Sequence, residues 1–133
     1  MKQNKNYHII HLEDNPDVAE RMSVLFENEE DVLYEHVSTV EDAFAVLDKK
    51  IPHLLLVDLM LLDDDDATPG VEFIKKAYDR YPGIIMMVLS NRGDQSLREE
   101  LEPYIIAYEV KIFKPSIYKE KLLKLLKKMD EEK

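Results

Sequence analysis

Apolar runs and segments with helical spacing alternate along the whole chain. The most apolar run covers residues 51–62 (IPHLLLVDLMLL) and contains a single acid, Asp58. A continuous run of this kind is typical of a strand that is buried on both faces of a sheet. Because an ionised carboxylate is costly to bury without a partner, we expect Asp58 at the carboxyl end of this strand.

The other apolar runs predict further strands, over residues 7–12, 32–37, 84–89 and, least regularly, 108–113. In the segments between these strands, apolar residues recur at helical spacing. Asn15 and Pro16 fit the N-cap and the first position of the first helix. Ser38 and Glu41 fit a capping box at the start of the second helix.

Two later helices have recognisable starts and faces. The third is expected to begin near residues 68–70, with Val71, Ile74 and Tyr78 on its buried face. The last follows the fifth strand and is expected to be capped by Ser116. Strands and helices therefore alternate as (βα)5, which predicts an α/β fold with a doubly wound, parallel five-stranded sheet.

Polar side chains follow the predicted strands at the points where the strands end. These residues are Glu13, Asp14, Asp58, Ser90 and Lys114. Ligand sites of open α/β sheets lie outside the carboxyl ends of the strands, so we expect these side chains to meet in one pocket. Neighbouring carboxylates repel each other unless they share a cation, and oxygen ligands favour a hard ion such as Mg²⁺. A carboxylate can also act as a nucleophile that forms an aspartyl phosphate.

Composition narrows the possible functions. The chain has 133 residues, enough for one domain, and a formal net charge of −10, which argues against direct nucleic-acid binding. It has no cysteine, so disulfides and thiolate metal sites are excluded. The polar N-terminus and the lack of a long apolar run predict no membrane insertion, and cytoplasmic localisation is the default expectation.

Four segments in this order resemble the receiver domain of the two-component response-regulator family. They are HLEDNP at 11–16, LLLVDLM at 54–60, VLS at 88–90 and KIFKP at 111–115. The resemblance extends over essentially the whole chain, which is similar to the chemotaxis receiver. It implies a flavodoxin-like sheet with the strand order 2-1-3-4-5 and a single receiver domain over residues 1–133, without an output domain.

The same resemblance implies a Mg²⁺ site. Asp14 matches the direct ligand of the ion, and Glu13 matches a second acid that usually acts through water. Asp58 matches a further ligand. Met60 matches the position that contributes its backbone carbonyl to the metal.

The resemblance also implies a function. Asp58 matches the phosphoacceptor, Ser90 the hydroxyl residue beside the phosphoryl group, and Lys114 the lysine that pairs with it. The donor would be a sensor histidine kinase or a phosphotransfer protein, and the phosphorylated domain would signal to a downstream protein by a conformational switch. Beyond Mg²⁺-dependent self-phosphorylation and self-dephosphorylation, no enzymatic activity is expected.

Some features depart from the family pattern. The loop after Asp58 is longer than usual and carries the aspartates at 63–66, and Lys111 stands where an aromatic residue is usual. Two alternatives therefore stay open. One is a pseudo-receiver that binds partners without phosphorylation. The other is a Mg²⁺-dependent phosphohydrolase, which would need a second acid where Met60 stands. The histidines lie at positions 8, 11, 36 and 53 and lack the spacing of metal ligands, which favours a structural role for them.

Overall fold

A parallel sheet in the order β2-β1-β3-β4-β5 lies at the centre of the computed structural model, which describes residues 7–59, 68–90, 95–110 and 115–131. Its strands are β1 (Tyr7–Leu12), β2 (Val32–Val37), β3 (Leu54–Asp58), β4 (Met86–Ser90) and β5 (Ala107–Val110). Every pairing between neighbouring strands is parallel. The predicted doubly wound sheet and its strand order are confirmed.

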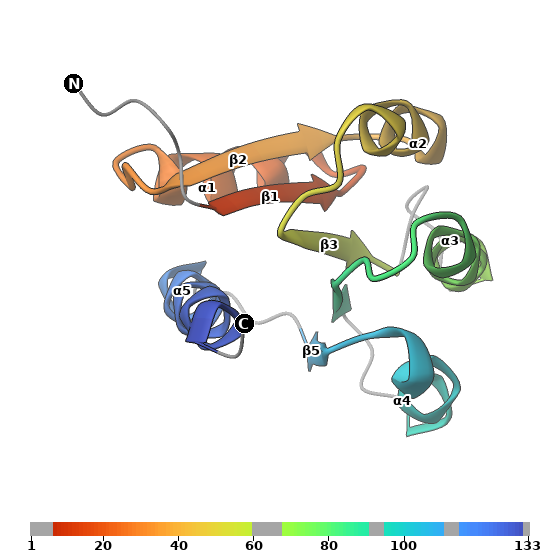
Figure 1. The fold of residues 1–133 in the computed structure, drawn as a ribbon. Coiled ribbons are helices and arrows are strands. Elements are labelled where there is room, and N and C mark those ends of the chain that lie inside the picture. Colours follow the sequence, from red (N-terminus) through yellow and green to blue (C-terminus); the bar gives the residue numbers. More distant parts are fainter. Residues whose placement is uncertain (1–6, 60–67, 91–94, 111–114, 132–133) are drawn as a thin grey trace.

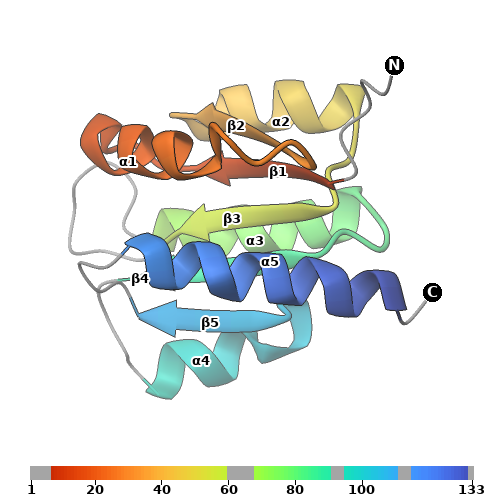
Figure 2. The ribbon, with the colours of Figure 1, turned by 90° about the vertical axis from the view of Figure 1, so that its left-hand side faces the viewer.

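Helices cover both faces of this sheet (Figure 1). One face carries α1 (Pro16–Phe26) and α5 (Pro115–Glu131). The other carries α2 (Val40–Lys49), α3 (Thr68–Arg80) and α4 (Gln95–Leu101), which continues into the 3-10 helix η2 (Glu102–Tyr104). Figure 2 views the first face and shows the strands running in one direction, so their carboxyl ends share one edge.

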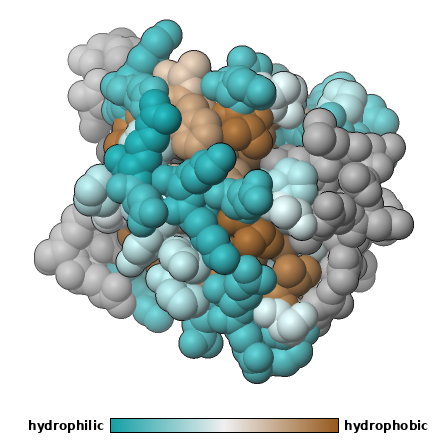
Figure 3. All heavy atoms as spheres, turned by 90° about the vertical axis from the view of Figure 1, so that its right-hand side faces the viewer, coloured by the Kyte–Doolittle hydropathy of each residue, from teal (hydrophilic) through white to brown (hydrophobic). Residues whose placement is uncertain are grey.

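Each face of the sheet has its own apolar core. Ile9 and Leu56 point toward α1 and α5, where they pack with Phe26 and Leu126. The neighbouring strand residues Ile10 and Leu55 point the other way, where they pack with Leu47 of α2, Phe73 of α3 and Leu101 of α4. The outer surface over these three helices is mainly hydrophilic, with small apolar areas between polar side chains (Figure 3). None of the described helices is long and apolar enough to span a bilayer.

The first two strands occupy the residues predicted for them. The first helix also begins as predicted, because the Asn15 side chain accepts hydrogen bonds from the backbone N–H groups of Asp17 (2.9 Å) and Val18 (3.4 Å). Pro16 is its first residue. This turn matters for function because it leads directly out of the acidic pair at the end of β1.

Three local predictions were wrong. Thr39 rather than Ser38 caps α2, since its hydroxyl accepts the N–H of Asp42 at 3.0 Å. Tyr78 is 44% exposed, because it lies at the border of the buried stripe of α3, and its ring packs edge-on against Tyr104. Ser116 lies inside α5, which already includes Pro115.

Two strands differ from their predicted lengths. Of the described residues in the run at 51–62, Leu54–Asp58 belong to the sheet, and β4 begins at Met86 rather than at residue 84. Ile84 and Ile85 are apolar but lie before the first residue of β4 that pairs with β3. Residues 51–53 precede β3, Leu59 follows it, and residues 60–62 lie outside the described part of the chain. The fifth strand is described up to Val110, and the rest of its predicted range lies outside the described residues.

Helix α3 approaches the end of β3 so closely that only glycine fits between them. A Cβ atom on Gly70 would lie 2.7 Å from the carbonyl oxygen of Leu59 and 2.8 Å from its Cα atom. Both separations are shorter than a van der Waals contact. Because Leu59 directly follows Asp58, this contact fixes the backbone beside the acidic residues.

The variant Gly70→Ala tests this contact. Within a helix, alanine is normally favoured over glycine by about 1 kcal/mol. Here the added methyl group must displace backbone, which typically costs about 1–3 kcal/mol. We therefore expect a lower free energy of unfolding in urea, together with shifted amide resonances for Asp58 and Leu59.

Gly83→Ala is the matched control. Gly83 has a positive φ of 84° and open space around it, so alanine there strains the backbone without touching a neighbour. It should lower stability but leave the resonances of Asp58 in place. A Gly70→Ala protein as stable as the unmodified one would contradict the proposed role of the contact.

Candidate functional site

Three carboxylates converge at the carboxyl edge of the sheet. Glu13 and Asp14 follow the last residue of β1, and Asp58 ends β3 beside them, because Leu12 pairs with Val57. One carboxylate oxygen from each acid lies within 4.8 Å of those from the other two. The structure thus brings together three of the residues that the sequence places in one site.

Two of these acids are almost completely buried. Glu13 is 0% and Asp58 2% exposed, whereas Asp14 is half-buried at the mouth of the site. Buried carboxylates need hydrogen bonds or a counter-charge, and the N–H of Asn15 supplies one hydrogen bond, to Glu13 Oε2 at 3.2 Å. The N-terminus of α1 begins at this turn, and its dipole favours negative charge there.

Hydrogen bonds to backbone groups hold the two strand ends that carry the acids. The N–H of Glu13 donates to the carbonyl of Val37 at 3.0 Å, which extends the pairing of β1 with β2. Nε2 of His36 donates to the carbonyl of Glu13 at 2.6 Å. The N–H of Leu59 donates to the carbonyl of Leu89 at 3.3 Å on the other side. The acidic turn is therefore fixed from β2 and β4 as well as from its own strands.

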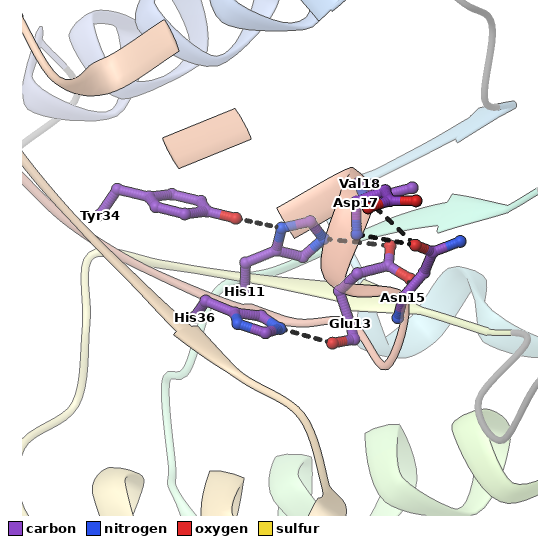
Figure 4. A network of polar contacts seen from close by, with 7 residues as sticks. All are labelled: His11, Glu13, Asn15, Asp17, Val18, Tyr34 and His36. Carbon is purple, nitrogen blue, oxygen red and sulfur yellow. Dashed lines mark hydrogen bonds and ion pairs between the residues drawn. The ribbon is translucent and has the colours of Figure 1, made fainter. Parts of the chain in front are cut away.

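A tyrosine and a histidine lie in a row beside Glu13, as Figure 4 shows. His11 is fully buried, with Nδ1 at 2.6 Å from the Tyr34 hydroxyl and Nε2 at 3.7 Å from Glu13 Oε1. Burial raises the pKa of the Tyr34 phenol, and the Glu13 carboxylate raises it further. The phenol therefore keeps its proton at neutral pH.

From the sequence, His11 and His36 were expected to have a structural role only and were not connected with the acids. A signal was available. His11 lies two residues before Glu13, and both strands were predicted with correct bounds, so side-chain alternation places His11 and Glu13 on one face. What was missing was the register of β1 against β2, which pairs His11 with His36 and brings Tyr34 alongside.

The other predicted site residues are placed only in part. Ser90 is the last residue of β4 and is fully buried, one position beyond Leu89, the strand partner of Asp58. Met60 and Lys114 lie outside the described residues, as do Lys111 and the aspartates at 63–66.

The donor set suits a hard divalent cation. Three carboxylates supply only oxygen ligands, and Asp14 leaves one side of the cluster partly open to water. Mg²⁺ typically binds through one or two carboxylates and keeps several water molecules. A partly hydrated Mg²⁺ ion therefore fits these residues better than a metal that prefers nitrogen or sulfur ligands.

Known structures share this fold, although no protein-family model and no curated protein matches the chain. A CheY-like response regulator receiver domain protein from Methanospirillum hungatei JF-1 superposes with a TM-score of 0.81, covering 96% of this chain and 98% of its own, at 20% identity. The receiver domain of the Francisella response regulator 1452 gives a TM-score of 0.77, covering 93% and 99%, at 16% identity. The chain has the fold of a CheY-like receiver domain.

A third receiver-fold match concerns the metal. Response regulator TrrA from Thermotoga maritima, solved in complex with Mg(2+)-BeF, gives a TM-score of 0.72, covering 90% of this chain and 98% of its own, at 18% identity. At these identities the similarity establishes the fold. The chemistry must be argued from the residues of the site.

Removing one charge from the cluster tests cation binding. In the unmodified protein, Mg²⁺ at about ten times its Kd should raise the free energy of unfolding by about 1.4 kcal/mol. Asp14→Asn should lose most of this gain, and should be more stable than the unmodified protein when Mg²⁺ is absent, because carboxylate repulsion is reduced. Urea unfolding with and without Mg²⁺ at constant ionic strength measures both effects.

Asp17→Asn is the control, because Asp17 is an exposed acid on the first turn of α1 and lies outside the cluster. It should respond to Mg²⁺ as the unmodified protein does. Equal responses of the two variants would show that the cluster does not bind the ion.

Proposed function

We propose that this domain is a phosphoacceptor of the response-regulator type, in which Asp58 receives a phosphoryl group. The observation that carries the proposal is the convergence of Glu13, Asp14 and Asp58 at the carboxyl edge of a receiver fold. A nucleophilic carboxylate beside two further acids is the arrangement that metal-assisted phosphoryl transfer requires.

The acids have two roles in this reaction, since they bind the metal ion and one of them is the nucleophile. Glu13, Asp14 and Asp58 would hold Mg²⁺, and the family resemblance adds the backbone carbonyl of Met60. When bound there, such an ion would supply positive charge to neutralise the oxygens of a phosphoryl group. An Asp58 oxygen attacks the phosphorus atom, the bond between phosphorus and the donor breaks, and the donor leaves with the bonding electron pair. The product is an acyl phosphate on Asp58.

Two other groups act on the transferred phosphoryl group. The Ser90 hydroxyl donates a hydrogen bond to one of its oxygens, and the Lys114 ammonium pairs with another. Ser90 is fully buried at the end of the strand next to β3, which is a suitable position for this contact. No residue is assigned as a base for repeated turnover, so the domain acts as a switch rather than as an enzyme.

The added charge provides the signal. A phosphoryl group shifts the population between two conformations only as far as it binds one of them better, and its contacts to Ser90 and Lys114 supply that difference. We propose a sensor histidine kinase or a phosphotransfer protein as the donor. A downstream protein that recognises the phosphorylated conformation receives the signal.

Intact-mass measurement after incubation with acetyl phosphate tests the proposal. With Mg²⁺ present, the protein should gain the mass of one phosphoryl group. Without Mg²⁺ the gain should be largely lost, and Asp58→Asn should abolish it because the amide is not a nucleophile. Asp31→Asn, which removes an exposed acid far from the cluster, should leave the gain intact.

The alternatives give other results. An unmodified mass under all conditions, from a folded protein, would favour a pseudo-receiver that docks partners without phosphorylation. Continuous release of inorganic phosphate over many turnovers would favour a phosphohydrolase. Modification that persists in Asp58→Asn would show that another residue is the acceptor.

Ser90→Ala tests the second contact. A hydrogen bond to a charged group contributes about 1.5–3 kcal/mol, and only the part gained in the transition state changes the rate. We expect phosphorylation by acetyl phosphate to be about tenfold slower, with the fold retained. Ser23→Ala makes the same chemical change at an exposed position of α1 and should not alter the rate. Equal rates for both variants would remove Ser90 from the site.

A further inference from the structure

A column of polar side chains leads from the second strand to the acidic cluster. Tyr34 on β2 contacts His11 on β1, and His11 in turn faces Glu13 (Figure 4). The imidazole is fully buried between the other two groups, with 2.6 Å from Nδ1 to the Tyr34 hydroxyl oxygen and 3.7 Å from Nε2 to Glu13 Oε1. The imidazole therefore presents Nε2 to the Glu13 carboxylate beside it.

The tyrosine determines where the imidazole carries its hydrogen. The Tyr34 phenol keeps its proton, so it can donate to Nδ1 of a neutral His11 ring. The ring hydrogen then lies on Nε2, the nitrogen that faces Glu13. A doubly protonated ring also has hydrogen on Nε2. Only the opposite neutral tautomer would turn a nitrogen lone pair toward the carboxylate, and that arrangement is repulsive.

The tyrosine is itself held in place. Its ring stacks on Phe26 of α1, with 5.6 Å between ring centroids and 15° between ring planes. It also meets His11 edge-on, at 5.9 Å and 65°. The hydroxyl therefore has a fixed position relative to β1, and removing it leaves the stacking surface unchanged.

We propose that Tyr34 and His11 are positioning residues that orient the Glu13 carboxylate for the cation. The hydroxyl of Tyr34 fixes the tautomer of His11, and the Nε2–H group attracts Glu13 Oε1. This directs Glu13 Oε2 toward the N–H of Asn15 and keeps the carboxylate in one orientation at the cluster. The inference rests on the proposed function, because it assigns this orientation to the Mg²⁺ site. His36 acts separately, since it binds the backbone carbonyl of Glu13.

The tautomer can be observed directly. In protein labelled with ¹⁵N in its histidines, long-range ¹H–¹⁵N spectra distinguish protonated from unprotonated ring nitrogens. We expect a protonated Nε2 for His11 in the unmodified protein, and a partial shift toward protonated Nδ1 in Tyr34→Phe. An unprotonated Nε2 in the unmodified protein would overturn the proposal, whatever the domain binds.

Mg²⁺ affinity tests the consequence for the site. Groups that orient metal ligands typically change affinity by about 10–100-fold when removed. Because Nε2 lies 3.7 Å from the carboxylate oxygen, we expect the lower end, about tenfold weaker binding of Mg²⁺ by Tyr34→Phe in isothermal titration calorimetry. Stability is measured on the same samples in urea.

Tyr81→Phe is the matched control. The Tyr81 hydroxyl also makes a short hydrogen bond, 2.7 Å to Asp48, but it lies in the apolar core on the other face of the sheet. Its removal should lower stability to a similar degree without changing Mg²⁺ affinity. Equal affinities for the two variants would show that Tyr34 serves only to satisfy a buried histidine.

The outcomes separate this inference from the function on which it rests. If the unmodified protein binds no Mg²⁺, the proposed function fails, and with it the use of Glu13 at a metal site. If the protein binds Mg²⁺ and accepts phosphoryl groups while Tyr34→Phe binds the ion with unchanged affinity, only the positioning role fails.

Discussion

The repulsion among three closely spaced carboxylates is the constraint on which the rest of the site depends. Two unit charges 4.8 Å apart repel by about 3.5 kcal/mol at an effective dielectric constant of about 20. The free energy of unfolding of a domain of this size is typically only about 5–15 kcal/mol, so this repulsion is a large destabilising contribution. The N–H of Asn15, the start of α1 and Nε2 of His11 offset part of it. A divalent cation offsets far more, because it attracts all three groups at once.

The same cluster explains why several backbone contacts close to it are tight. A ligand set is useful only if its oxygens stay within a few tenths of an ångström of their positions, and rigid elements achieve this better than loops. Glu13 is fixed through its N–H by Val37, and the residue after Asp58 is fixed by Leu89. Gly70 lets α3 pack directly on that residue. Each contact comes from a different element, so the geometry does not depend on a single strand.

The sequence was sufficient for the parts that depend on local pattern. Strands β1 and β2 and the Asn15 cap follow from short apolar runs with polar residues at both ends, and parallel strands then place the acids at one edge. It was insufficient where tertiary packing decides between equal local choices. Ser38 and Thr39 are comparable caps, and Tyr78 lies close to the buried stripe of α3. The contact of His11 with Glu13 additionally required the register of β1 on β2 and the position of the Tyr34 ring.

Fold alone would not support a phosphoacceptor, because one fold can carry many functions. The free-energy cost of burying acids at the site is the argument for a phosphoacceptor. A module that used this fold only for docking would be more stable with an apolar residue in place of Asp58, at a strand end that is 2% exposed and lies next to a fully buried leucine. Local departures from stability rules tend to occur where function requires them. Here the departure consists of three acids in one place, two of them almost completely buried, and the proposed phosphoryl transfer would use each of them.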